Sequence, residues 1–192
     1  MTGIRVYHGF RSPYSRLGLH MVARAGLAAE IIPFTGPPEG DRFDDPMENR
    51  LKLSYYFHDA PRMTMRLGLP MRPPAPFDVD VTAANKAAVA AELDGRGLAF
   101  ALAVSDARWG RGRDISDLSL LQKCAGEAGW DPSRVETAQE DGEVAAAMTR
   151  HRGQIAEDGV FGVPFAVMGA RKYWGHDRFH ILAEDAGAEA VN

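Results

Sequence analysis

The first thirty-four residues constrain the fold of this chain more than any other segment. Residues 4–7 (IRVY) are a short apolar run that is typical of a buried strand. Ser12 and Pro13 then predict the start of a helix, because serine is a favoured N-cap and proline is tolerated in the first helical turn. Gly26 is expected to end that helix, and EIIPF (residues 30–34) predicts a second strand. Such a compact strand–helix–strand unit favours parallel pairing of the two strands.

The rest of the chain shows two further patterns. Helical periodicity with almost no strand signal covers residues 47–59, 83–107, 114–128 and 132–157. FAVMGARKYWG (residues 165–175) then predicts two short strands around a Gly-Ala turn, and HDRFHILAEDA (residues 176–186) a last helix. This order predicts an α/β chain with a thioredoxin-like fold and an all-helical insertion. We expect one unit of 192 residues, with the thioredoxin-like domain at about 1–45 and 158–192 and the helical insertion at about 46–157.

Three positions set expected boundaries inside the helical block. Asp114 and the pair Asp131-Pro132 predict helix starts, because an N-cap residue followed by a good first-turn residue favours initiation. Pro61 predicts a kink or a stop, because proline lacks the N–H that a helix interior needs.

Composition excludes several classes of function. The formal net charge of −4 comes from mixed signs without long blocks, so nucleic acid is not an expected partner. No apolar run approaches the roughly 18 residues of a membrane span, and the N-terminus lacks a secretory pattern, so we expect a cytoplasmic protein without a membrane partner. The single Cys124 cannot form an internal disulfide and is expected to pack on the inner face of a helix.

The stretch FRSPYSRLG (residues 10–18) contains the first candidate site. With cysteine at the two serines it would carry a C-P-Y-C redox motif at the start of a helix. A helix N-terminus stabilises a nearby anion, and the hydroxyl of Ser12 can donate a hydrogen bond to one that a ligand brings. A thiolate on a bound thiol cofactor is the natural candidate, and Arg11 and Arg16 flank the site. Ser-Pro at a helix start also occurs without any function, so that alternative stays open.

A second candidate site lies near the end of the chain. Pro164 precedes a predicted strand, and a cis Val163-Pro164 bond would expose the backbone of Val163. Asp177 at the start of the last helix suits either a helix-capping acid or a carboxylate that holds a ligand ammonium. His176 and His180 are four residues apart, but no third ligand has suitable spacing, and no metal is predicted.

Four blocks in order, from about residue 4 to residue 185, resemble the family that contains 2-hydroxychromene-2-carboxylate isomerase and the kappa-class glutathione transferases, relatives of the DsbA-type oxidoreductases. The blocks are SPYS at 12–15; K-x-x-Y-x-x-x-D-x-x-R made by Lys52, Tyr55, Asp59 and Arg62, with Gly68 and Pro70; Gly95, Arg96, Ala99, Phe100, Ala107, Trp109 and GRDISD; and VFGVP with YWGHDR.

The resemblance implies glutathione as cofactor. It implies that Ser12 holds the cysteinyl sulfur, that Val163 before Pro164 offers backbone hydrogen bonds, and that Asp177 receives the γ-glutamyl end with help from the backbone of His176. It also implies an isomerase or transferase that acts on a small molecule, such as an aromatic or unsaturated keto acid, and a homodimer. Candidates for contact with the substrate are Arg11, Arg16, Lys52 and Trp109.

The chain departs from the family pattern near the expected substrate. Gly9 stands where the family often has Asp, Arg16 where it has an aromatic residue, and Phe165 where Thr is common. His176 replaces an Asn or Gln, and the usual Asn-Ser or Asn-Thr pair is missing at 80–81. A non-catalytic thioredoxin-fold module that binds glutathione or a peptide therefore stays open as the alternative. The roles of Lys52, Tyr55, Asp59 and Arg62 also stay open.

Overall fold

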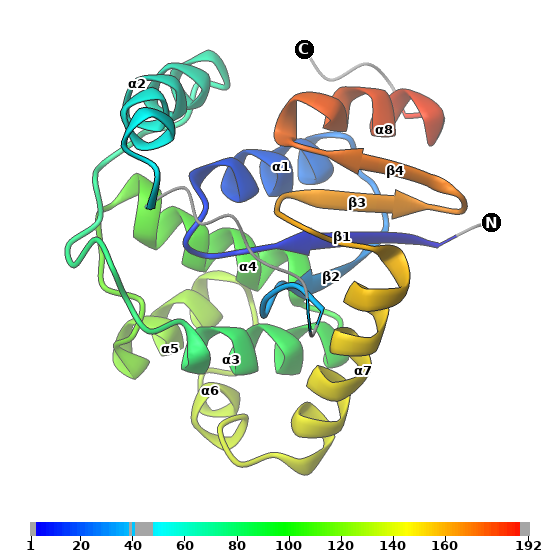
Figure 1. Ribbon diagram of the computed structural model, residues 1–192. Coiled ribbons are helices and arrows are strands. Elements are labelled where there is room, and N and C mark those ends of the chain that lie inside the picture. The colour runs from blue at the N-terminus through cyan, green and yellow to red at the C-terminus, as the bar shows by residue number, and fades with distance from the viewer. Residues whose placement is uncertain (1–2, 39, 41–47, 189–192) are drawn as a thin grey trace.

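A computed structural model describes residues 3–38, 40 and 48–188 (Figure 1). Its centre is a mixed four-stranded sheet with the strand order β2-β1-β3-β4. The strands are β1 (Ile4–His8), β2 (Ala29–Pro33), β3 (Phe165–Met168) and β4 (Arg171–Trp174). The predicted boundary between thioredoxin-like domain and insertion, at about residues 45–46, and the predicted helix start at residue 47 lie outside the described residues.

The predicted N-terminal unit is confirmed. Strand β1 pairs in parallel with β2, in a register that places Ile4 beside Ala29, and α1 (Pro13–Arg24) connects them. Strand β3 runs antiparallel to β1 and pairs with β4 across the predicted Gly-Ala turn. Because β1 and β3 are neighbours, the two ends of the chain form one sheet, which is the predicted α/β thioredoxin-like fold.

The segment between β2 and β3 is helical throughout its described elements. In chain order these are α2 (Arg50–Arg66), α3 (Thr82–Leu93), α4 (Gly97–Ser105), the π-helical turn η2 (Asp106–Gly110), α5 (Leu118–Glu127), α6 (Ser133–Thr137) and α7 (Gly142–Asp158). The chain ends with the 3₁₀ turn η3 (His176–Arg178) and α8 (Phe179–Asp185).

Several predicted helix boundaries were wrong. The helix expected at 83–107 is broken at Gly95, whose φ of 70° suits glycine. The helix expected at 132–157 is two helices, because Asp141 caps α7 by accepting bonds from the N–H groups of Glu143 and Val144. Asp114 starts no helix, since α5 begins only after its cap, Asp117.

Helix α2 also continues past Pro61, where a kink or stop was expected. A proline inside a helix removes one hydrogen bond and crowds the carbonyl four residues earlier. Buried Asp59 and Ala60 before the proline, and Thr64 after it, anchor the same face of α2. We attribute the continuity of the helix to this packing.

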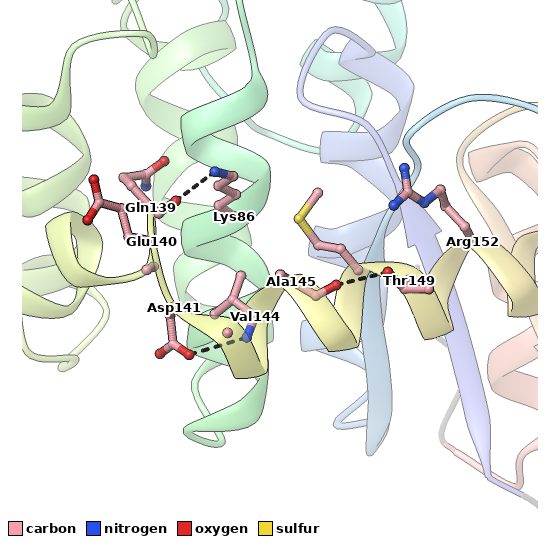
Figure 2. A pocket seen from close by; sticks show the side chains of 11 residues that line it. Lys86, Gln139, Glu140, Asp141, Val144, Ala145, Thr149 and Arg152 are labelled. Atoms are coloured by element: carbon pink, nitrogen blue, oxygen red, sulfur yellow. Dashed lines mark hydrogen bonds between the residues drawn. The ribbon is translucent and has the colours of Figure 1, made fainter.

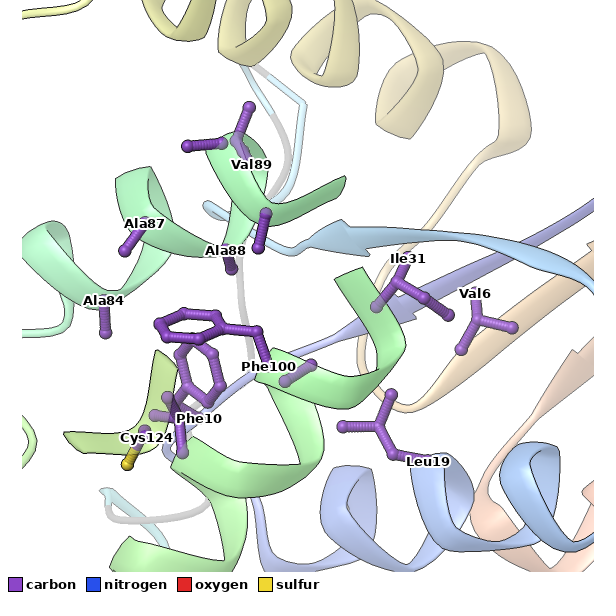
Figure 3. Close-up of a cluster of buried hydrophobic side chains, with 14 of the residues drawn as sticks. Val6, Phe10, Leu19, Ile31, Ala84, Ala87, Ala88, Val89, Phe100 and Cys124 are labelled. Atoms are coloured by element: carbon purple, nitrogen blue, oxygen red, sulfur yellow. The ribbon is translucent and has the colours of Figure 1, made fainter. Parts of the chain in front are cut away.

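The two faces of the sheet are covered by different helices. Helices α1 and α8 lie on one side and α7 on the other (Figure 1). Alternation along β1 directs Val6 into the larger core cluster and Tyr7 into a smaller one with Ile155 of α7. Figure 3 shows the larger cluster, in which alanines of α3 pack near Phe10 and Phe100.

Cys124 is buried in that cluster, as predicted. Burial raises the pKa of its thiol to about 11. None of the helices in the described part of the chain has the length and apolar character to cross a bilayer.

Candidate functional site at the N-terminus of helix α1

Ser12 is the N-cap of α1 and lies four residues after the carboxyl end of β1. Its Oγ accepts a hydrogen bond of 3.1 Å from the N–H of Ser15, and its own N–H donates to the carbonyl of Gly9. Ser12 is half-buried, whereas Ser15 is buried and accepts from the N–H of Gly9. Since the Ser12 oxygen acts only as an acceptor in these bonds, its hydroxyl proton is left to donate elsewhere.

Val163 lies directly beside this turn. A Cβ on Gly9 would come within 3.1 Å of Val163 Cγ2, so the glycine permits the close approach of the two segments. The Val163-Pro164 peptide bond is cis. Pro164 is buried, and its carbonyl accepts from the N–H of Gly175. Within the described chain, neither the N–H nor the carbonyl of Val163 has a hydrogen-bond partner.

His176 lies near Ser12 because its ring packs on the first turn of α1. It stacks on Tyr14 of α1, with ring centroids 5.1 Å apart and planes 16° from parallel. His176 is buried and its Nε2 has no partner. Burial lowers its pKa, although Asp177 and Asp59 oppose this, so the ring is neutral at pH 7.

Asp177 is exposed and its carboxylate accepts from Arg178 Nη1 at 2.8 Å. Both side chains are more than half exposed, so the pair holds the carboxylate only weakly. A ligand ammonium can therefore compete with Arg178 for Asp177 at little cost.

The family motif on α2 contacts this site through Asp59. Asp59 is buried and accepts a 2.7 Å bond from the Tyr14 hydroxyl as well as a bond from Arg62. Burial opposes the charge of Asp59, but bonds from Tyr14, Arg62 and Tyr55 outweigh it and hold the pKa below its ordinary value. These contacts join α2 to α1. Lys52 lies in the first turn of α2, where its backbone N–H donates to the Asn49 side chain.

Of the two flanking arginines, Arg16 is committed to the fold. It is buried, and its Nε donates to Asp106 at 2.6 Å while Nη1 donates to the carbonyl of Pro70. His20 also contacts Asp106, at 2.9 Å. Arg11 is exposed and donates through Nε and Nη2 to the carbonyl of Val79.

Trp109 is buried and ties η2 to the turn before Ser12. Its Nε1 donates to the carbonyl of Phe10 at 2.9 Å, and its ring meets Phe77 edge-on. The neighbouring Arg108 was not among the predicted site residues. It is 1% exposed, and its Nε and Nη1 have no partner. No sequence signal distinguishes Arg108 from the exposed Arg111 and Arg113 nearby.

His8 was also missed by sequence reasoning. It is fully buried at the end of β1, and both of its ring nitrogens lack partners. Burial lowers the pKa of His8 to about 3, so the ring is neutral near pH 7 and packs edge-on against Phe10.

A separate pocket of about 490 Å³ lies between α3 and the start of α7 (Figure 2). It is lined by residues such as Lys86, Gln139 and Arg152, none of which belongs to the surroundings of Ser12. Lys86 Nζ already donates to the carbonyl of Gln139 there. In the described residues, no group of three His, Cys, Asp or Glu side chains is placed to hold a metal ion.

Residues 3–186 match the family of DsbA-like thioredoxin domains. The chain belongs to this family. It is also 26% identical over 138 residues to a 2-hydroxychromene-2-carboxylate isomerase from Pseudomonas putida, which covers 72% of this chain and 67% of the relative. These matches confirm the predicted resemblance.

Solved structures agree on the fold. The structure of a 2-hydroxychromene-2-carboxylate isomerase superposes with a TM-score of 0.78 and 22% identity, covering 96% of this chain and 94% of that one. A probable DsbA oxidoreductase from Streptomyces coelicolor gives 0.75 and 19%, covering 100% and 92%. The cytosolic disulfide reductase DsbM from Pseudomonas aeruginosa, solved with GSH, gives 0.65 and 17%, covering 96% and 98%.

This DsbA-like chain lacks the thiols of a disulfide exchanger. Serines occupy positions 12 and 15, and Cys124, the one cysteine of the sequence, is buried in the helical region. The site instead assembles a hydroxyl donor, a helix N-terminus, a free backbone amide and a weakly held carboxylate. That set suits an external ligand with a sulfur, an amide backbone and an ammonium group.

Proposed function

We propose that the protein is a glutathione-dependent isomerase or transferase in which Ser12 stabilises the cofactor thiolate. The observation that carries the proposal is that two groups open to a ligand lie at the same turn. Ser12 has a hydroxyl proton free to donate, and in the described chain Val163 has an N–H and a carbonyl without partners. Glutathione has complementary groups, since its cysteinyl residue carries both a thiol and amide functions. The reductase solved with GSH supports this choice of cofactor.

Ser12 and α1 act together on the thiol. The helix dipole places about half a positive charge at the N-terminus, which favours a thiolate over a thiol. The hydroxyl of Ser12 adds a charge-assisted hydrogen bond. The neutral ring of His176, stacked on Tyr14, packs beside the site and adds no charge.

The remaining residues orient the cofactor. The N–H and carbonyl of Val163 would pair with the cysteinyl backbone, and Asp177 would exchange Arg178 for the γ-glutamyl ammonium. When bound, glutathione supplies a nucleophilic thiolate that adds reversibly to an unsaturated acceptor. From the resemblance to the isomerase and kappa-class transferase family we also propose a small-molecule substrate of the unsaturated or aromatic keto acid type. The same resemblance supports a cytoplasmic homodimer.

Calorimetric titration with reduced glutathione tests the cofactor and its activation together. Measured in two buffers of different ionisation heat at pH 7, the heats count the protons released on binding. We expect saturable binding with release of a substantial fraction of a proton. Ser12→Ala should retain binding within about tenfold, because one charge-assisted bond contributes about 1.5 kcal/mol, and should release far fewer protons.

Asp117→Ala provides the matched control, because Asp117 is also a helix N-cap, on α5. Loss of either cap is expected to cost about 1 kcal/mol of stability, but only Ser12→Ala should change proton release. Binding of wild type without proton release would support the non-catalytic module instead. Absence of binding at millimolar glutathione would remove the cofactor from the proposal.

A further inference from the structure

Arg108 is a buried cation without a matching anion. Its side chain belongs to η2 and is almost inaccessible, with the residue 1% exposed. Nη2 donates to the carbonyl of Phe77 at 2.6 Å, while Nε and Nη1 have no hydrogen-bond partner. In the described chain no carboxylate lies within ion-pair distance of this guanidinium. Arginine stays charged in proteins, so the charge is present and unpaired.

The neighbouring Arg16 shows what a structural arginine looks like in the same place. Arg16 is equally buried, but it pairs with Asp106 and donates to the carbonyl of Pro70. A buried charge without a partner is unfavourable by several kcal/mol, so folding alone would favour an apolar side chain at Arg108. Burial lowers the pKa of Arg108, and the second positive charge of Arg11 lowers it further. Arg11 itself pairs with exposed Asp78 at 3.2 Å, and the attraction of Asp114 and Asp78 offsets these effects only in part.

The surroundings of Arg108 are aromatic on one side and reach the Ser12 turn on the other. The guanidinium carbon lies 5.3 Å from the ring centroid of Trp109, whose Nε1 bonds to the carbonyl of Phe10. Phe77 packs against both Trp109 and Phe57 and is 38% exposed. A planar apolar group fits such rings, and an anion fits the guanidinium.

We propose that Arg108, with Arg11 beside it, binds the carboxylate of the second substrate, a planar unsaturated acid. The inference rests on the proposed function, which gives Ser12 to the thiol. Val163 and His176 reach the Ser12 turn through Gly9 and Tyr14 and would be occupied by glutathione, whereas Trp109, next to Arg108, reaches the turn through the carbonyl of Phe10. The acceptor would then meet the sulfur from the Trp109 contact.

Binding of trans-cinnamate and of its neutral analogue trans-cinnamamide, measured by calorimetry without glutathione, tests the site. Wild type is expected to bind cinnamate at least tenfold more tightly than cinnamamide. Arg108→Met should bind both with the same weak affinity, and Arg108→Lys should retain part of the preference. Arg111→Met, which removes an exposed charge three residues away, should leave the preference unchanged.

Thermal unfolding of the ligand-free protein separates a binding role from a structural one. Arg108→Met should raise the melting temperature by about 2 to 4 °C, because it removes an unpaired buried charge. Arg16→Met should lower it, because Asp106 loses its arginine partner and keeps only the contact with His20. A lower melting temperature for Arg108→Met, together with an unchanged preference for cinnamate, would overturn the inference.

Glutathione itself carries a glycyl carboxylate, which is the other source of a suitable anion. If Arg108→Met weakened glutathione binding tenfold and left glutathione monoethyl ester unaffected, Arg108 would belong to the cofactor site and the inference would fail. Cinnamate binding that depends on Arg108 in a protein that binds no glutathione would instead sink the proposed cofactor and keep the anion site.

Discussion

The Asp158 network and the surroundings of Ser12 both place polar groups against β1, but only the first is closed. At Asp158, the carboxylate accepts two bonds of 2.8 Å from Arg5 and one of 2.5 Å from the Tyr7 hydroxyl. Around Ser12, buried nitrogens of His8, Arg108 and His176 have no partners.

The difference separates polar groups that stabilise the fold through partners within the chain from polar groups that are open to a ligand. The Asp158 network joins β1 to the end of α7, and each member satisfies another. Unsatisfied buried groups weaken a fold. His151 and Gln154 on α7 carry one such atom each, but more of them lie near the end of β1, a concentration that is unusual for a purely structural region. It coincides with the helix N-terminus that suits an anion.

Breaking the closed network is expected to have the largest effect. Asp158→Asn keeps the shape but removes the charge, which leaves the partly buried Arg5 without an anion. We expect the free energy of unfolding to fall by about 3 kcal/mol in urea denaturation at pH 7. Glutathione binding should be unchanged, because Asp158 lies on the α7 face of the sheet.

The same variant has a defined pH dependence. Burial opposes the charge on Asp158, but bonds from Arg5 and Tyr7 hold the pKa below its ordinary value. Its stabilisation is therefore present above about pH 4, the unfolded pKa, and is lost as the pH falls through the folded one. Wild type and Asp158→Asn should converge in stability at low pH. A gap that stayed constant down to pH 2 would contradict an ionic role.

Local sequence signals predicted the helix and strands that position Ser12. The buried groups without partners around Ser12 could not be predicted in this way, because they depend on tertiary contacts. Ser12 before Pro13 and Gly26 after the helix are read within a few residues, so α1 and the strands around it were predictable. The place of Val163 beside Ser12 came from the family resemblance. That Nε and Nη1 of Arg108 lack partners depends on segments far away in the sequence, such as Phe77 at 31 residues, and no local pattern predicts it.

Glu92 extends the comparison to a half-buried acid that has no ion-pair partner in the described chain. Burial raises the pKa of Glu92 to about 7, a backbone bond from Ile31 opposes the rise, and Glu30 adds to it. Protonated Glu92 carries no buried charge, so its contribution to the free energy of unfolding is complete below about pH 4.5, the unfolded pKa. That contribution is lost as the pH rises through about 7, the folded pKa. Glu92→Gln should therefore add about 1 to 2 kcal/mol at pH 8 and nothing at pH 4, measured by urea denaturation. Equal effects at both pH values would show that Glu92 is ionised throughout.

The smallest expected effect concerns Tyr14, whose hydroxyl makes a closed contact with Asp59 close to Ser12. Tyr14→Phe keeps the stack on His176 but removes the hydrogen bond to Asp59. We expect a loss of about 1 kcal/mol in the free energy of unfolding and a change of less than about threefold in glutathione affinity. Both are measured on the same protein, by urea denaturation and calorimetry.

Tyr56→Phe is the matched control, because Tyr56 packs edge-on against Tyr14 and its hydroxyl makes no hydrogen bond within the described chain. It should change neither quantity. If Tyr14→Phe instead weakened glutathione binding tenfold or more while stability fell by only about 1 kcal/mol, the Tyr14 hydroxyl would have to leave Asp59 and bond the ligand. Tyr14 would then belong with the groups that are open to a ligand, and α1 would carry both such groups and groups that only stabilise the fold.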